Sequence, residues 1–211
     1  AEAGERITVS FAGQQATATA TDSGEWSVQL KPLETSFDGR ELVCRGNSSR
    51  VTISDVLVGE VWLCGGQSNM EWSLRASRDA DVEIPSANSP AIRFLRMPHI
   101  ARPEPQSDFP ISKSDNGGRD WKRCIPEEVE NCTGVGYYFA RRLQRRLKCP
   151  IGLIDTSWGG TMAQHWVSTK TLRSFEEVKP YFDTFYEQLK TWEDGGGEGG
   201  AVRRYSAAVK K

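Results

Sequence analysis

Two short apolar runs, each ending in a pair of glycines, constrain the fold more than any other feature of the chain. They are GEVWLCGG at residues 59–66 and IGLIDTSWGG at residues 151–160. Mostly apolar runs of this length are typical of strands that are covered on both faces of a parallel sheet. A helical pattern ends just before the second run. Strand, helix and strand in this order predict a right-handed crossover in a parallel sheet, and so an α/β fold.

The helical pattern is TGVGYYFARRLQRRLK at residues 133–148. Thr133 is suited to cap its N-terminus, and Pro150 stops it. The spacing places the apolar residues on one face and the basic residues toward solvent. The residues expected on the apolar face are Val135, Phe139, Leu143 and Leu147.

The first 55 residues have a different pattern, with short alternating segments separated by turn residues. The expected strands are RITVSFAG, QATATAT, EWSVQLK, ELVCRG and RVTISDV, and a further strand, AIRFLRM, follows later in the chain. The early segments predict a small antiparallel sheet or sandwich. We therefore divide the chain into a β-rich module at residues 1–55 and a second domain at residues 56–211.

The C-terminal part is expected to be helical, with an interruption at Pro180, and it leads into EDGGGEGG. This tract has too little apolar surface to offset the ordering entropy of about 1–2 kcal/mol per residue. We therefore expect residues 193–202 to be flexible.

Composition excludes several functions. The 27 Lys and Arg residues are balanced by 28 Asp and Glu residues, which argues against nucleic acid as a partner. No apolar stretch approaches the ~20 residues that a membrane span needs. The five cysteines leave at least one thiol unpaired; Cys124 and Cys132 either close a small loop or are free thiols. No C-x-x-C pair occurs, and neither histidine has ligand spacing to a cysteine, so no metal site is expected.

Ser68 follows the first apolar run directly and is the main candidate for chemistry. In an open parallel sheet, loops that follow the strands converge on a crevice, and Ser68 lies at such a strand-to-helix junction. The preceding glycines permit a tight turn and a close approach of substrate. The alternative is a serine that only caps the helix. Spacing alone leaves both interpretations open.

The segment DVLVGEVWLCGGQSNMEW resembles the nucleophile block of the sialate O-acetylesterases and related carbohydrate acetylesterases, a branch of the SGNH-type hydrolases. The run from residue 133 to residue 166, which contains SWGGT and Trp166, is similar to the second block of that family. The resemblance implies a three-layer, flavodoxin-like SGNH hydrolase domain, present in part. It also implies that the preceding β-rich module is jelly-roll-like.

The resemblance implies that Ser68 is the nucleophile of a carbohydrate O-acetylesterase, which passes through an acetyl-enzyme. The Ser68 amide would be one oxyanion donor, and Gly159 or Gly160 would supply the second. Gln67 and Asn69 either hold the loop or are exposed turn residues. The implied substrate is an O-acetylated sugar or sialic acid. No metal or organic cofactor is implied.

The chain departs from the family pattern because it has neither a block of the type WYQGE nor an Asp-x-x-His. It therefore resembles the N-terminal half of an esterase, and a C-terminal half carrying Asp-x-x-His is a candidate partner. His165 is a possible base or part of the pocket wall, whereas a surface or packing role is expected for His99. The implied location is extracellular, periplasmic or the lysosomal lumen.

The alternative to the esterase is a catalytically silent carbohydrate-binding or scaffold fragment that lacks the base. A lipase-like enzyme is disfavoured because the serine motif is not G-x-S-x-G. Trp72 and Trp158 either stack on a sugar or belong to the core, and Trp62 and Trp121 are expected in the core. Asp155 either orients a histidine or caps the turn that follows its strand, and the cap is the preferred interpretation.

Overall fold

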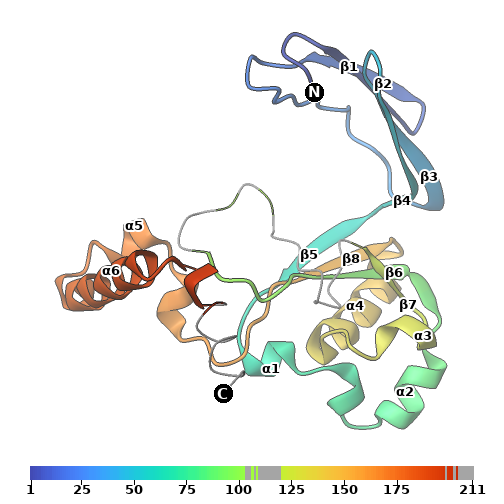
Figure 1. Ribbon diagram of the computed structural model, residues 1–211. Helices are drawn as coiled ribbons and strands as arrows, with labels where there is room; N and C mark the ends of the chain where they lie inside the picture. The colour runs from blue at the N-terminus through green and yellow to red at the C-terminus, as the bar shows by residue number, and fades with distance from the viewer. Residues whose placement is uncertain (103–105, 107, 109–119, 198, 202, 204–211) are drawn as a thin grey trace. The chain divides into compact units, whose positions relative to one another are not determined.

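The computed structural model describes residues 1–102, 106, 108, 120–197, 199–201 and 203. The chain falls into two compact units. The first comprises Ala1–His99 and Ile111–Gly159, and the second comprises Ile100–Pro110 and Gly160–Lys211. Two four-stranded sheets and helices α1–α4 belong to the first unit (Figure 1). The expected mixed α/β fold is confirmed.

The N-terminal sheet is antiparallel and has the strand order β2-β1-β3-β4. In β1 (Arg6–Phe11) burial alternates because successive residues of a strand point to opposite faces: Ile7, Val9 and Phe11 are buried and Arg6, Thr8 and Ser10 are not. The expected antiparallel sheet is confirmed, whereas the jelly-roll-like arrangement stays a prediction. The strands are β1 (Arg6–Phe11), β2 (Gln14–Thr19), β3 (Ser36–Arg45) and β4 (Arg50–Val58).

One expected strand of this module is absent. Residues 25–31 have no strand structure. The Gln14 side chain binds the backbone of Lys31 instead: Lys31 N–H donates to Gln14 Oε1 at 2.8 Å, and Gln14 Nε2 donates to the Lys31 carbonyl at 3.2 Å. These bonds satisfy the Lys31 backbone without a strand partner, so alternation alone was misleading here.

The second sheet confirms the predicted parallel crossover. Its order is β5-β8-β6-β7, with β5, β8 and β6 parallel and β7 antiparallel at one edge. Cys64 pairs with Asp155, which in turn pairs with Arg96, so three strands reach the same level at their carboxyl ends. The strands are β5 (Glu60–Cys64), β6 (Ser89–Arg96), β7 (Lys122–Cys124) and β8 (Ile151–Asp155).

The order of these parallel strands differs from the flavodoxin-like one. In that order the first strand lies between the second and the third. Here β8, the third parallel strand, lies between β5 and β6.

The boundary between the two sheets lies at Gly59, because the last strand of the first sheet ends at Val58 and the first strand of the second sheet begins at Glu60. The domain division at residues 55 and 56 stays a prediction.

The larger of two core clusters in the first unit lies between the second sheet and its helices, which Figure 1 shows below the sheet. Ile151 and Leu153 of β8 and Ile92 of β6 are fully buried there. The helices are α1 (Ser68–Glu71), a 3-10 helix (Leu74–Ala76), α2 (Ala80–Ser86), α3 (Pro126–Val129) and α4 (Gly134–Leu147).

The other face of β5 is open, which corrects the expectation of a strand covered on both faces. Val61 and Leu63 are 62% and 69% exposed. Among the described residues β5 pairs only with β8, so it is an edge strand. An edge strand has a neighbour on one side only, which leaves its side chains more accessible than those of β8.

Helix α4 begins as predicted, because the Thr133 side chain accepts a hydrogen bond from Gly136 N–H at 3.2 Å. Its buried face is not the predicted one. Gly136, Tyr137 and Ala140 are buried, whereas Phe139 and three further positions of the predicted face are only partly covered or exposed. The small residues decide the face, because a Cβ at Gly136 would come within 3.0 Å of Leu153 Cδ1. The helix therefore packs close to β8.

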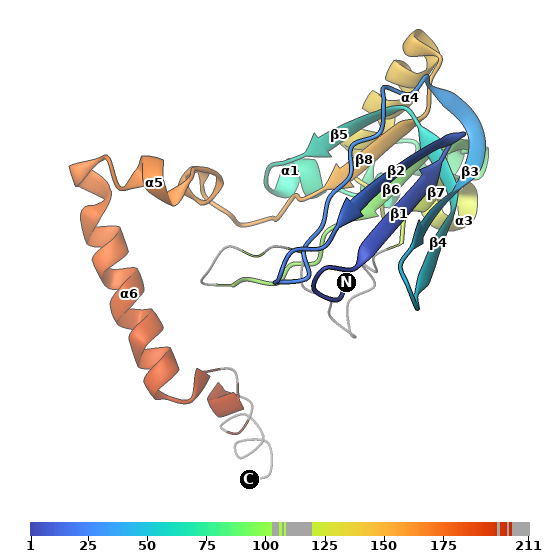
Figure 2. The same cartoon turned by 90° about the horizontal axis from the view of Figure 1, so that it is seen from above.

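The regular secondary structure of the second unit, where the structure describes it, is helical (Figure 2). Pro180 lies in the first turn of α6, a position that needs no backbone donor, so it begins the helix and does not interrupt one. The elements are a 3-10 helix (Ala163–Trp166), α5 (Thr169–Leu172), a second 3-10 helix (Glu176–Val178) and α6 (Lys179–Asp194). No helix among the described residues combines the length and apolar character needed to cross a membrane.

The glycine-rich tract starts within α6. Glu193 and Asp194 are helical, and Gly200 N–H donates to the Gly196 carbonyl at 2.9 Å. Residues 198 and 202 lie outside the described part. The flexibility of residues 193–202 stays a prediction.

Candidate functional site

Ser68 lies just beyond the carboxyl end of β5, where it is the first residue of α1. The N-cap of this helix is Gln67, and Ser68 Oγ donates to Gln67 Oε1 at 3.2 Å. The alternative in which Ser68 caps the helix is therefore excluded. Its hydroxyl is exposed and is free of any bond to a backbone amide of the described chain.

The turn after β8 continues alongside the turn after β5. Thr156 N–H donates to the Cys64 carbonyl at 3.0 Å, and Trp158 N–H donates to the Gly66 carbonyl at 2.9 Å. These bonds bring Gly159 beside the serine: a Cβ built on Gly159 would lie 3.7 Å from Ser68 Cα. The meeting of the two glycine-rich turns follows from the parallel pairing of β5 and β8.

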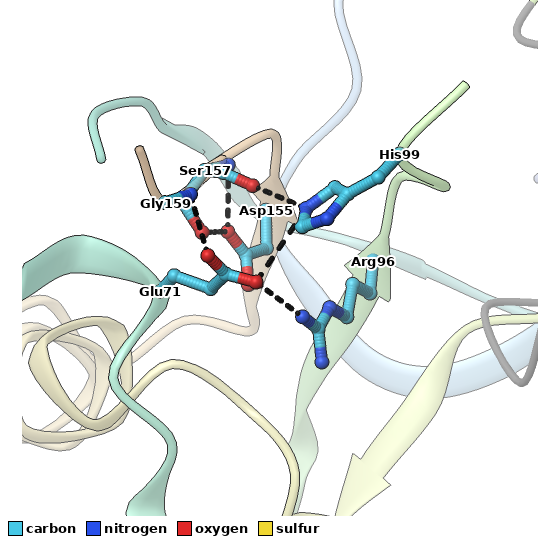
Figure 3. Close-up of polar contacts among 6 residues, drawn as sticks. All are labelled: Glu71, Arg96, His99, Asp155, Ser157 and Gly159. Atoms are coloured by element: carbon cyan, nitrogen blue, oxygen red, sulfur yellow. Dashed lines mark hydrogen bonds and ion pairs between the residues drawn. The ribbon is translucent and has the colours of Figure 1, made fainter. Parts of the chain in front are cut away.

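Glu71 joins the two turns through its carboxylate, as Figure 3 shows. Gly159 N–H donates to Glu71 Oε2 at 2.5 Å. Arg96 forms an ion pair with Glu71 Oε1 at 3.0 Å, and His99 Nε2 lies 3.7 Å from the same oxygen. Sequence reasoning missed Glu71 and Arg96. The only available signal was the spacing of three residues between Ser68 and Glu71, which places both on one side of a helix.

His99 also contacts this turn. Its Nε2 lies 2.8 Å from the Ser157 carbonyl, and its ring stacks on Trp158 with centroids 4.6 Å apart (Figure 3). Of the surface and packing roles expected for His99, the structure selects packing, and the partner is the turn beside Ser68, which no sequence pattern indicated. Trp158 is thereby fixed by stacking within the protein.

Asp155 ends β8 and caps the turn as predicted. Its Oδ1 accepts hydrogen bonds from Ser157 N–H at 3.0 Å and from Ser157 Oγ at 2.5 Å. Both residues are buried. The carboxylate therefore shapes the turn locally.

Three of the five cysteines are unsuited to act as a second nucleophile. All five are free thiols, which selects the free-thiol alternative for Cys124 and Cys132. Burial, reinforced by the nearby Asp155 charge, raises the pKa of Cys64 to about 11. Burial also raises the pKa of Cys124 to about 11 and raises that of Cys132. The thiolate is the nucleophilic form of cysteine, so these side chains are unreactive near neutral pH.

Gly160 and His165 belong to the second unit. His165 Nδ1 accepts a hydrogen bond from Met162 N–H at 3.1 Å, and its Nε2 lies 3.3 Å from the Tyr181 hydroxyl oxygen. Both ring nitrogens therefore have partners within that unit. The structure thus brings together Ser68, Gln67 and Gly159 of the predicted site residues.

Asn69 lines a groove on a neighbouring side of α1, together with Trp72, Ser77, Gly134, Val135 and Tyr138. Trp72 is 55% exposed at this groove. Trp62 and Trp121 were expected in the core, but both are 41% exposed. Trp62 is on β5, the edge strand of the described sheet, and the Trp121 ring lies over Gly152 beside Val61.

No group of three or more His, Cys, Asp or Glu side chains within the described residues is arranged to hold a metal ion.

Comparison with known proteins identifies the family. Residues 58–191, more than half of the chain, match the family described as carbohydrate esterase, sialic acid-specific acetylesterase. The human sialate O-acetylesterase is 29% identical over 170 residues, which cover 76% of this chain and 32% of the relative. The rat sialate O-acetylesterase is 26% identical over 186 residues, which cover 82% and 34%.

A solved structure agrees with this match. The crystal structure of a carbohydrate acetylesterase from Xanthomonas citri has a TM-score of 0.76 and 32% sequence identity, and the match covers 82% of this chain and 38% of that one. The chain thus spans about a third of the length of these relatives. By the match over residues 58–191, the chain belongs to the carbohydrate esterase family of sialic acid-specific acetylesterases.

Proposed function

We propose that the chain is the nucleophile-bearing part of a carbohydrate O-acetylesterase that acts on O-acetylated sugars, sialic acids included. One observation carries the proposal: an exposed serine at the carboxyl end of a parallel strand lies beside a glycine turn from the adjacent strand, in a chain of an esterase family. Sialate O-acetylesterase and carbohydrate acetylesterase are the activities named for the relatives.

The proposed reaction begins with attack of Ser68 Oγ on the acetyl carbonyl carbon. The Oγ–carbon bond forms, the proton of Oγ passes to a general base, and the sugar oxygen leaves as an alcohol after protonation. Water then hydrolyses acetyl-Ser68 to acetate. Gln67 Oε1, 3.2 Å from Ser68 Oγ, supports an orienting role for the Gln67 side chain.

The tetrahedral intermediate needs hydrogen-bond donors that are already in place. We assign the Ser68 backbone N–H as the first donor. For the second donor the candidates are Gly159 and Gly160, and the Gly159 N–H already donates to Glu71 Oε2. Both glycines stay candidates for the second donor. Asn69 remains a candidate for contact with substrate, because its side chain lines the groove next to Trp72.

We propose that the base is an Asp-x-x-His on a further segment, with His165 as a pocket-wall residue or a substitute base. The open face of β5 supports this proposal, because Val61 and Leu63 are exposed where a complete three-layer domain would cover them. The jelly-roll-like character of the N-terminal module and a location in the extracellular space, periplasm or lysosomal lumen are further parts of the proposal. Without the base, this chain should lose the ~10²–10⁴-fold contribution of general base catalysis.

The test is to treat the purified chain with p-nitrophenyl acetate and with an O-acetylated sialic acid. We expect slow release of p-nitrophenol and an acetyl group on Ser68, found by mass spectrometry of peptides, because deacylation without the base should be slow. Ser68→Ala should abolish both signals. Ser86→Ala is the matched control, since Ser86 is also exposed and its hydroxyl donates only to the Glu83 carbonyl.

Equal release by wild type and Ser68→Ala would contradict the proposal. Binding of the sugar with no acetylation of Ser68 would favour the catalytically silent carbohydrate-binding fragment instead. A loss of activity in His165→Ala as large as that in Ser68→Ala would assign the role of the base to His165.

A further inference from the structure

The carboxylate of Glu71 connects the ends of all three parallel strands. Glu71 follows Ser68 by three residues in α1, beyond β5, and its Oε2 accepts a hydrogen bond from Gly159 N–H beyond β8. Its Oε1 pairs with Arg96, the last residue of β6, at 3.0 Å. Both carboxylate oxygens are therefore used, and each contacts a different strand end (Figure 3).

We propose that Glu71 is a positioning residue that clamps the Ser157–Gly159 turn beside the nucleophile, a role that rests on the proposed function of Ser68. A hydrogen bond with one ionised partner is shorter and roughly twice as strong as one between neutral groups. The hydrogen bond from Gly159 N–H to the Glu71 carboxylate is of this kind. Arg96 keeps the carboxylate in place and compensates its charge.

Gly159 is suited to this clamp because it has no side chain. A Cβ at residue 159 would lie 2.6 Å from Glu71 Oε2, closer than non-bonded atoms approach, so any other residue would push the carboxylate away. The sequence thus supplies both halves of the contact: an acidic residue one turn after Ser68 and a glycine in the facing turn.

His99 adds a second set of contacts to the same turn. Its Nε2 lies 2.8 Å from the Ser157 carbonyl, where an Nε2–H would donate, and its ring stacks on Trp158. The same nitrogen is 3.7 Å from Glu71 Oε1. The turn is therefore held through the Gly159 amide by Glu71 and through Ser157 and Trp158 by His99.

The clamp fixes the distance between Ser68 and the turn that faces it. A misplacement of about 1 Å at a reacting centre can lower a rate about 100-fold. Loss of the carboxylate should therefore lower the limiting rate at which Ser68 is acetylated and should leave the half-saturating ester concentration nearly unchanged. A residue that served only for folding would instead lower the amount of native protein, without a change in the rate per folded molecule.

The experiment compares Glu71→Ala, Glu71→Gln and the control Glu60→Gln in the full chain. Glu60 is an exposed carboxylate at the start of β5 with no side-chain partner among the described residues. We expect acetylation by p-nitrophenyl acetate, per folded molecule, to fall about 10- to 100-fold in Glu71→Ala. Glu71→Gln should recover part of the rate, because its amide oxygen can still accept from Gly159 N–H, and Glu60→Gln should match wild type.

A second measurement does not depend on activity. The Gly159 amide proton should resonate downfield in ¹H–¹⁵N spectra of the wild type, because it donates to a carboxylate, and should move upfield in both Glu71 variants and less so in Arg96→Gln. An unchanged Gly159 resonance, or wild-type acetylation rates in folded Glu71→Ala, would overturn the clamp. Absence of Ser68 acetylation in the wild type would refute the proposed function, and the Gly159 resonance would still decide the contact.

Discussion

Helices cover one face of the second sheet and leave the other face open at β5. The same Leu→Ala substitution should therefore lower the free energy of unfolding by different amounts on the adjacent strands β8 and β5. Leu153 on β8 is fully buried against α4, whereas Leu63 on β5 is 69% exposed on the open face. Leu153→Ala removes three carbons, worth about 0.8 kcal/mol each, or about 2.4 kcal/mol in total. The cavity that remains adds to this, so we expect a loss of about 3–4 kcal/mol, within the usual range of 2–5 kcal/mol.

Leu63→Ala removes the same three carbons from a side chain that keeps roughly a third of its surface buried. The expected loss is below about 1 kcal/mol. Urea unfolding followed by far-UV circular dichroism measures both. With a denaturant slope near 2 kcal/mol/M, the midpoint should fall by about 1.5–2 M for Leu153→Ala and by less than about 0.5 M for Leu63→Ala.

Equal losses for the two variants would refute this reasoning. A large effect of Leu63→Ala would mean that the open face of β5 is covered in solution, for example by a second copy of the chain, and the effect should then depend on protein concentration. A small effect of Leu153→Ala would mean that α4 does not pack on β8 as the structure has it.

Two further predictions concern the cap of α4 and the buried thiols. Thr133→Val keeps the shape of this buried residue but removes the acceptor of Gly136 N–H, so urea unfolding should show that the free energy of unfolding falls by about 1–2 kcal/mol. Ser168→Ala removes the cap of α5, which is exposed, and should lower the free energy of unfolding by less because water can replace the hydroxyl. The pKa of Cys64 is raised by burial from 9.0 to about 11, so the unfolded chain releases this proton at a lower pH than the folded chain. The free energy of unfolding should therefore fall as the pH rises from about 9 toward 11. Between pH 8 and pH 10 it should fall less in Cys64→Ala than in the wild type. An equal fall in both proteins would contradict the raised pKa of Cys64.

Patterns that depend on local spacing were predicted well from the sequence. The two apolar runs identified β5 and β8 as parallel strands, and Thr133 was identified as the cap of α4. Asp155 was expected to cap the turn after β8 and does so. Each of these features is decided by residues that are close in the chain or by the general behaviour of strand ends, so the sequence carries the information.

Features that depend on contacts between distant segments were not predicted. The buried face of α4 follows from Gly136 and Ala140, because small residues let a helix approach β8, and the count of large apolar residues pointed to the wrong face. Trp62 is exposed because β5 is an edge strand of the described sheet, a property of strand order that no local pattern reveals.

For the site, the sequence by itself determined that a serine and a glycine turn follow two parallel strands, because a motif and its spacing are local. Only the tertiary structure decided that Glu71, Arg96 and His99 meet at the Ser157–Gly159 turn. These residues come from three separate segments, and their meeting depends on the strand order and register that place β8 between β5 and β6. A hydrogen bond acts over about 3 Å, so its partners are known only once the chain has brought them within that distance.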